Sequence, residues 1–257
     1  MAKASAFAPV GCRGTMRLPR MPLSCFVMAD VSAPTANADT DITREAEPVA
    51  RTPVPEVLNS ITHAIGAGLS IAGLVVLLVV SGETPSPWKY AGFSIYGVTQ
   101  IALYLASALL HGLHGYPRAR AVLSRLDHSF IFVLIAGTYT PACLILLRKS
   151  VGWLLLGLIW GLALVGITLK AILAREKWPY VSILYVPMGW VAFAFYRPLV
   201  EATSPAFMAL LIAGGICYTG GIAFYAWRRL PFAHLVWHLF VLAGGTLLYL
   251  AYLLHVA

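Results

Sequence analysis

Two pairs of polar side chains have the types and the spacing needed for chemistry at a metal ion. Ser107 precedes His111 by four residues, and His234 precedes His238 by four. A separation of four residues places both members of a pair on one face of a helix. Three neutral imidazoles around one open position form the usual catalytic zinc site. We therefore expect His111, His234 and His238 to bind a zinc ion.

Asp127 is the acidic residue that best complements such a site. Beyond residue 60 the other acids are Glu83, Glu176 and Glu201, and the first and last of these fall at the other side of the predicted membrane. We expect Asp127 to hold the water bound at the metal and to accept its proton. Ser107 would donate a hydrogen bond to Asp127 or to a substrate carbonyl. All-imidazole sites also accept copper, nickel or cobalt, so those metals are alternatives to zinc.

The composition assigns the chain to the integral membrane proteins. Of its 257 residues 60% are hydrophobic and only 11% are charged, which is too apolar for a water-soluble domain of this length. The formal net charge of +8 comes mainly from lysines and arginines in short loops between apolar runs. This distribution indicates topology signals and contact with membrane lipids, and no nucleic-acid partner is expected. The four cysteines show no paired spacing, so neither a disulfide framework nor a Cys-x-x-Cys metal site is expected.

Apolar runs long enough to cross a membrane occupy most of residues 54–257. They predict an all-α membrane protein, a seven-transmembrane helix bundle. The fifth run is short and contains Pro187 and Gly189, which predicts a broken or kinked helix. The predicted spans are 61–80, 91–111, 128–147, 152–172, 180–196, 206–226 and 236–254.

Residues 1–53 differ from the rest of the chain. They are rich in Ala, Pro, Thr and Asp and have no apolar period, so they are expected to form a disordered N-terminal tail. Met16, Met21 and Met28 are alternative starts, and part of the tail could therefore come from a misplaced start codon.

The loop charges predict the orientation in the membrane. The even-numbered loops are the more basic, so they are expected to face the cytoplasm, with the N-terminus cytoplasmic and the C-terminus outside. The second, fourth and sixth loops are predicted to hold Arg118, Arg120 and Arg125, then Lys170, Arg175 and Lys177, then Arg228 and Arg229. The odd-numbered loops hold Lys89, then Arg148 and Lys149, then Arg197.

This orientation collects the histidines at the cytoplasmic ends of the spans, with the exception of His255. Glu56, Asn59 and His63 begin the first span there, and we expect them to form a polar network beside the metal site. Direct binding of the metal by His63 is the alternative. The remaining two, His114 and His128, are expected to be interfacial side chains satisfied by headgroups and water.

Four motifs together resemble the hemolysin III family, the bacterial branch of the progestin and adipoQ receptor superfamily. They are Glu56-x-x-Asn59-x-x-Thr62-His63, Ser107-x-x-x-His111, Leu126-Asp127-His128-Ser129 running into Ala136-Gly137-Thr138-Tyr139, and Trp237-His238-Leu239-Phe240. The resemblance covers about residues 54–254.

This resemblance implies seven helices with a cytoplasmic N-terminus. It also implies zinc held near the cytoplasmic face by the histidines at positions 111, 234 and 238, with Asp127 at the zinc water and Ser107 beside it. In many bacterial relatives a further histidine follows the last Ala-Gly, whereas this sequence reads Gly245-Thr246-Leu247-Leu248. Any role of that histidine elsewhere is therefore in doubt here.

The sequence is compatible with three functions. The first is a zinc-dependent hydrolase acting on a membrane lipid amide or ester and linked to membrane homeostasis, by attack of zinc-bound hydroxide on a polarised carbonyl. The second is a pore-forming cytolytic protein, as the family name suggests, although the polar residues gather at one end of the spans rather than in stripes along them. The third is a lipid-sensing receptor with a structural zinc. The family resemblance places the protein in the bacterial plasma (inner) membrane.

Overall fold

The computed structural model describes residues 53–173, 178–227 and 229–257. The predicted disordered tail, residues 1–53, therefore lies outside the described residues except for its last one. The loop residues Arg175, Lys177 and Arg228 also lie outside them.

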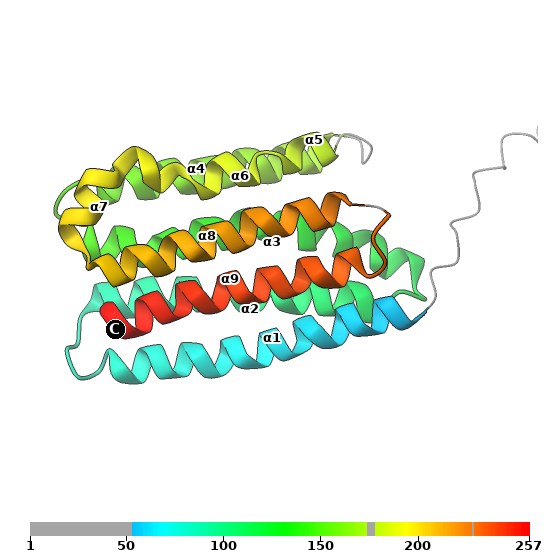
Figure 1. Ribbon diagram of the computed structural model, residues 1–257, viewed down its shortest axis with the longest axis horizontal. Helices are drawn as coiled ribbons and strands as arrows, with labels where there is room; N and C mark the ends of the chain where they lie inside the picture. Colours follow the sequence, from blue (N-terminus) through cyan, green and yellow to red (C-terminus); the bar gives the residue numbers. More distant parts are fainter. Residues whose placement is uncertain (1–52, 174–177, 228) are drawn as a thin grey trace, which may run out of the picture. The chain divides into compact units, whose positions relative to one another are not determined.

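Seven helical segments in the described residues are long and apolar enough to cross a membrane, as predicted. They are α1 Pro53–Val80, α2 Pro87–Gly112, α3 Pro117–Pro141 with the π-helical turn Ala142–Leu146, α4 Gly152–Ile172, a broken fifth span from Tyr180 to Ala202, α8 Pro205–Ala226 and α9 Ala233–His255 (Figure 1). The described residues contain no strand, so the prediction of an all-α seven-span membrane protein is confirmed.

Proline and serine set the starts of several helices. Pro87, Pro117 and Pro205 occupy the first turns of α2, α3 and α8, where the missing N–H of proline costs no helical hydrogen bond. Before two of these helices, Ser86 and Ser204 accept hydrogen bonds from backbone N–H groups of the first turn, at 3.3 and 3.1 Å. α2 and α3 thus begin several residues before their predicted spans, at 91 and 128, whereas α8 begins one residue before its predicted span.

The early start of α3 corrects the predicted second loop. Arg118, Arg120 and Arg125 are helical residues of α3 and not loop residues, because Pro117 starts the helix ahead of the apolar run. Lys170 was likewise predicted in the fourth loop. It lies in the last turn of α4, where it is buried and its Nζ donates a hydrogen bond to Ser182 Oγ at 2.8 Å.

The fifth span is broken, as Pro187 and Gly189 predicted. It consists of α5 Trp178–Ser182, α6 Tyr185–Gly189, the 3-10 turn Val191–Phe195 and α7 Tyr196–Ala202. A break inside a membrane exposes backbone groups that need new partners. Tyr139 of α3 supplies them, because its hydroxyl donates to the carbonyl of Gly189 at 2.6 Å and accepts the N–H of Ala192 at 3.1 Å.

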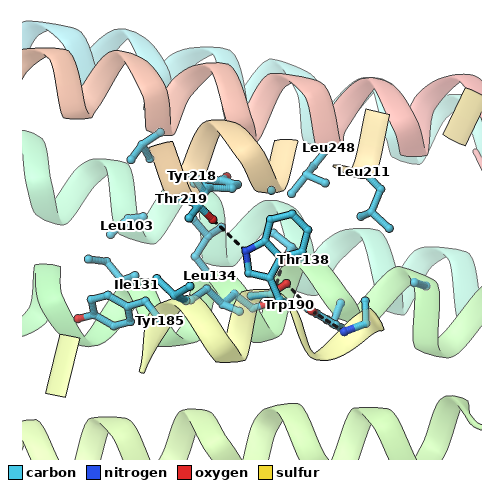
Figure 2. A pocket seen from close by; sticks show the side chains of 18 of the residues that line it. Leu103, Ile131, Leu134, Thr138, Tyr185, Trp190, Leu211, Tyr218, Thr219 and Leu248 are labelled. Carbon is cyan, nitrogen blue, oxygen red and sulfur yellow. Dashed lines mark hydrogen bonds between the residues drawn. The ribbon is translucent and has the colours of Figure 1, made fainter. Parts of the chain in front are cut away.

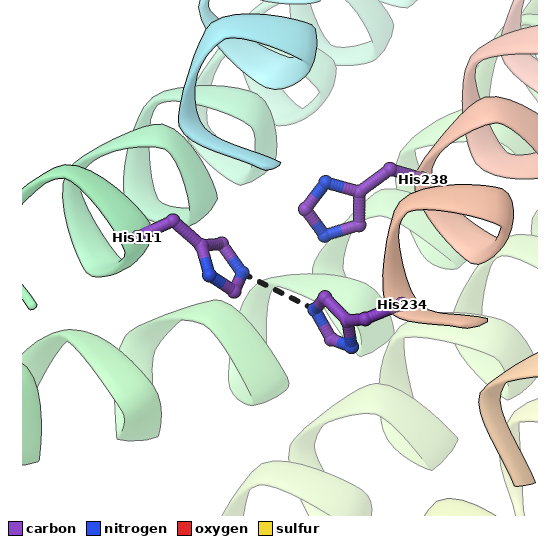
Figure 3. Close-up of side chains that lie close together, drawn as sticks. All are labelled: His111, His234 and His238. Atoms are coloured by element: carbon purple, nitrogen blue, oxygen red, sulfur yellow. Dashed lines mark hydrogen bonds between the residues drawn. The ribbon is translucent and has the colours of Figure 1, made fainter. Parts of the chain in front are cut away.

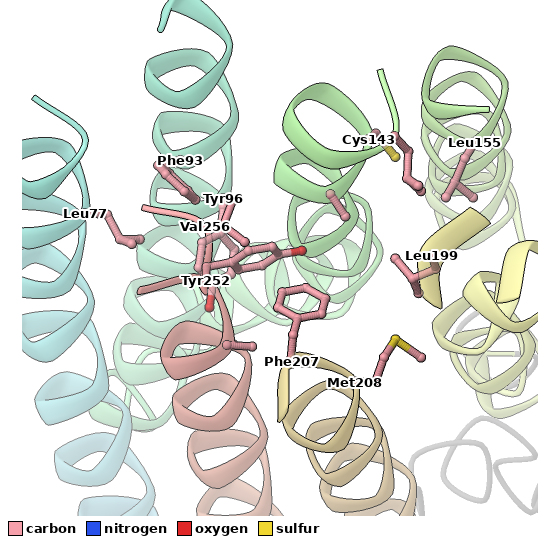
Figure 4. Close-up of a cluster of buried hydrophobic side chains, with 13 residues drawn as sticks. Leu77, Phe93, Tyr96, Cys143, Leu155, Leu199, Phe207, Met208, Tyr252 and Val256 are labelled. Carbon is pink, nitrogen blue, oxygen red and sulfur yellow. The ribbon is translucent and has the colours of Figure 1, made fainter. Parts of the chain in front are cut away.

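The spans pack mainly as sequential neighbours. α2 lies between α1 and α3, α3 packs on α4, and α9 packs on both α8 and α1. Close to the ends of α1 and α9 and the start of α2, a buried cluster of apolar and aromatic side chains joins all seven spans (Figure 4). Its largest members are Phe93, Tyr96, Phe207 and Tyr252. This cluster fixes the end of the bundle opposite to the one where α1 and α3 begin.

Gly152 closes the tight turn between α3 and α4, and we expect Gly152→Ala to lower the thermal stability. A Cβ at this position would lie 2.2 Å from the backbone oxygen of Cys143, and a backbone atom cannot move aside by changing rotamer. Overpacking of this kind costs about 1–3 kcal/mol. The check is the unfolding temperature of detergent-purified protein. Gly157→Ala on the same helix is the control, because its Cβ would meet no atom within 4 Å; equal melting of the two variants would contradict the prediction.

Candidate metal centre

The three predicted ligands come together at one end of the bundle. His111 lies in the last turn of α2, and His234 and His238 lie in the first two turns of α9. One ring nitrogen of each residue lies within 4.8 Å of those of the other two (Figure 3). The Nε2 atoms of His111 and His234 are 3.2 Å apart. The antiparallel course of the two helices and the four-residue spacing on α9 together produce this arrangement.

Glu56 fixes the orientation of the His111 ring. The Nδ1–H of His111 donates to Glu56 Oε2 at 2.6 Å, and the carboxylate is almost completely buried in the first turn of α1. With its proton on Nδ1, the ring presents the lone pair of Nε2 to His234 and His238. The other carboxylate oxygen, Oε1, accepts from Arg120 Nη2 at 3.1 Å. Glu56 therefore acts on the metal centre through His111.

The contacts of His63 differ from those predicted for a polar network with Glu56 and Asn59. Its ring stacks on that of His238, with centroids 3.6 Å apart and planes 7° from parallel. Neither ring nitrogen of His63 has a hydrogen-bond partner among the described residues, so His63 is not hydrogen-bonded to Glu56 or Asn59. The buried Asn59 Oδ1 also has none. Glu56 is therefore hydrogen-bonded to His111 and His63 is stacked on His238, but a continuous hydrogen-bonded network does not join the three residues of the first span.

The donor set fits a divalent first-row metal ion. Three imidazoles converge, one is oriented by a carboxylate, and the buried Nδ1 of His238 has no hydrogen-bond partner among the described residues. Buried polar nitrogens without partners are costly, so such an atom marks a place where a ligand or ion is expected. Imidazole ligands suit zinc, copper and nickel alike, and the geometry therefore supports a metal without selecting zinc.

Asp127 and Ser107 face the same cavity as the metal centre. The cavity is lined at this end by His63, Ser107, Asp127 and His238. Asp127 interacts with the Ser107 hydroxyl, its side chain is 16% exposed, and its Oδ2 lies 3.7 Å from His128 Nδ1. The predicted base and its serine partner thus line one cavity together with His238, one of the three predicted ligands.

Away from this polar end the cavity is lined almost entirely by apolar and aromatic side chains. It extends past Leu134 and Trp190 to Leu211 and Leu248 (Figure 2), and then to Tyr252 in the opposite cluster. Trp190 closes one side of it, since its Nε1–H donates to Thr219 Oγ1 of α8 at 2.9 Å. A polar site therefore opens into a long apolar chamber within the membrane region.

The remaining histidines have local partners. His114 and His128 donate from Nδ1 to backbone carbonyls of their own helical turns, those of His111 and Ser124, at 3.1 and 2.7 Å. The carbonyl of His128 also accepts the hydroxyl of Tyr185 at 2.8 Å. His255 lies at the other end, where its Nδ1 pairs with Ser204 Oγ at 3.2 Å. These contacts assign none of the three to the metal centre.

Sequence reasoning missed the roles of Arg120 and Lys170. Both were assigned to loops as topology signals, whereas Arg120 donates to the buried Glu56 and Lys170 donates to the partly buried Ser182. For Lys170 the available signal was a lysine at the end of an uninterrupted apolar run. For Arg120 no local pattern gave a signal, because its partner Glu56 is far away in the sequence.

A seven-span helical membrane protein with a three-histidine centre near one end of its spans is the class that the fold and the site define. Residues 52–249 match the family model described as Haemolysin-III related. The chain belongs to this family, which confirms the resemblance inferred from its motifs.

Individual relatives agree with this assignment. Hemolysin-3 of Bacillus cereus is 42% identical over 201 residues, which are 78% of this chain and 91% of the relative. The Hemolysin-3 homolog of Bacillus subtilis (strain 168) is 40% identical over 200 residues, covering 78% and 93%. Monocyte to macrophage differentiation factor of Homo sapiens is 28% identical over 207 residues, covering 75% and 81%. The similarity thus extends beyond bacterial hemolysins and supports the wider superfamily.

Proposed function

We propose that the protein is a zinc-dependent hydrolase that cleaves an amide or ester bond of a membrane lipid and serves membrane homeostasis. The observation that carries this proposal is the single cavity shared by Ser107, Asp127 and His238 at its polar end and by apolar side chains along the rest. Such a cavity matches a lipid whose polar linkage lies at the site and whose acyl chain occupies the chamber.

Each residue of the site would have its own role in the hydrolysis. A zinc ion held by His111, His234 and His238 would supply Lewis acidity toward the scissile carbonyl. Asp127 would take a proton from the attacking water and return it to the departing amine or alcohol, so that a carboxylic acid and an amine or alcohol are released. Ser107 would orient Asp127 through its hydroxyl. The apolar walls would hold the acyl chain and exclude bulk water from the linkage.

The proposed location is the bacterial plasma (inner) membrane, with the metal centre on the cytoplasmic side. The exposed arginines Arg118 and Arg125 lie at the same end of α3 as the site, and an excess of basic residues is typical of the cytoplasmic face. Fusion of a periplasmic reporter to the C-terminus tests this orientation, since the proposal requires the reporter to be active there.

The decisive experiment for the function is a substrate screen with zinc-loaded protein. Purified protein in vesicles that contain lipid amides and esters should release fatty acid, detected by mass spectrometry, and His238→Ala should not. Equal release, or no release, by the two proteins at full zinc occupancy of the wild type would contradict the proposal.

A lytic function is the second candidate, because the chain is 42% identical to a Bacillus cereus protein named Hemolysin-3. A lytic protein would release dye from liposomes when added in pure form, with or without an intact metal centre. Absence of leakage at high protein-to-lipid ratio would remove this candidate and leave the hydrolase.

A further inference from the structure

Arg120 is the outermost member of a chain of polar contacts that ends at the metal centre. It lies in the first turn of α3, and its guanidinium bonds to Glu56 Oε1 of α1. Glu56 in turn bonds through Oε2 to His111 of α2. Three spans thus contribute one residue each, and each carboxylate oxygen has a separate cationic or imidazole donor.

Because Glu56 is buried, its contact with Arg120 matters for the geometry of the site. The side chain of Glu56 is 3% exposed, whereas that of Arg120 is 35% exposed. A buried carboxylate is costly unless it is paired and hydrogen-bonded. Arg120 provides a positive charge from the aqueous end of the helix, and its planar fork restricts where Oε1 can lie. The position of the second oxygen, and with it the ring of His111, then follows from the rigid carboxylate.

From this geometry we infer that Arg120 is a positioning residue of the metal centre, acting on His111 through Glu56. The inference rests on the metal site of the proposed function but not on hydrolysis. Partners that orient metal-binding histidines typically contribute about 10- to 100-fold in metal affinity. Loss of the guanidinium should therefore weaken zinc binding although Arg120 touches no ligand nitrogen.

The test is the zinc dissociation constant of purified full-length protein, measured by competition with a chelator. Arg120→Gln is expected to raise the constant by about 10- to 100-fold. Arg118→Gln and Arg125→Gln are matched controls on the same helix, since both arginines are exposed and neither is placed at the site. Arg120→Lys keeps the positive charge but lacks the planar guanidinium, so its zinc affinity should lie between those of Arg120→Gln and the wild type.

A double-mutant cycle of zinc affinity, which combines Arg120→Gln with Glu56→Gln, separates the positioning role of Arg120 from a general loss of stability. If Arg120 acts through Glu56, then Arg120→Gln adds little to the loss already caused by Glu56→Gln. Unfolding temperatures of the metal-free proteins show whether the fold is kept. Wild-type affinity in Arg120→Gln, or fully additive losses in the double variant, would overturn the inference while leaving the proposed hydrolase intact. Absence of zinc binding by the wild type would overturn both.

Discussion

Replacing His238 by alanine is expected to reduce the zinc content of the purified protein from about one ion per chain to near zero, because three imidazoles are the fewest ligands that hold a catalytic zinc. The residue is buried, and its ring lies 5.0 Å from that of His111 and 4.6 Å from that of His234, measured between centroids. His111→Ala and His234→Ala should have the same effect. The measurement is elemental mass spectrometry of protein freed of loosely bound metal.

His255→Ala is the control for these three variants. It removes a histidine at the opposite end of the bundle, where the partner is a serine, so the zinc content should remain at the wild-type value. Zinc retained in all three site variants would show that the metal binds elsewhere. Copper, nickel or cobalt in the wild type, lost in the same variants, would keep the site and change the metal.

The second large effect is expected for Asp127→Asn, which should lower the turnover of the lipid substrate by about 10²- to 10⁴-fold, the usual contribution of a general base. Asparagine keeps the shape and an oxygen that can accept from Ser107, but it does not act as a base. The zinc content should remain unchanged, since Asp127 is not among the three clustered ligands. Turnover and zinc content are therefore measured on the same preparation.

Ser107→Ala provides the graded comparison for Asp127. It leaves the carboxylate in place and removes only the neighbouring hydroxyl, so its loss of turnover should be smaller than that of Asp127→Asn. Loss of zinc together with activity in Asp127→Asn would contradict the role of base and make Asp127 a ligand.

Hydropathy and spacing predicted most of the fold and the centre of the site. The spans follow from composition alone, because a lipid environment requires long apolar helices. The triad follows from the His234 and His238 spacing combined with the alternation of helix direction. The break in the fifth span follows from Pro187 and Gly189. These signals are hydropathy, short spacings and the alternation of helix direction, all of which can be read from the sequence.

The features that were missed have two causes, the polar starts of helices and packing between spans. Hydropathy does not register the polar first turns of α1 and α3, so both helices begin earlier than predicted. The partners of Glu56 are set by where α2 and α3 pass α1, which no local pattern encodes. The stacking of His63 on His238 likewise depends on the approach of α1 to α9.

Several polar side chains of the site lie within the terminal turns of their helices, and this placement affects how the protein is assembled in the membrane. These residues are Glu56, His111, Arg120 and His234. A polar side chain at the centre of an isolated membrane helix is expensive, but one at its end can stay hydrated at the bilayer surface. Each helix can therefore insert singly before its polar partners arrive. The contacts among these residues form only when helices associate in the second stage of folding. Biogenesis of the membrane-embedded chain thus precedes, and does not require, completion of its metal centre.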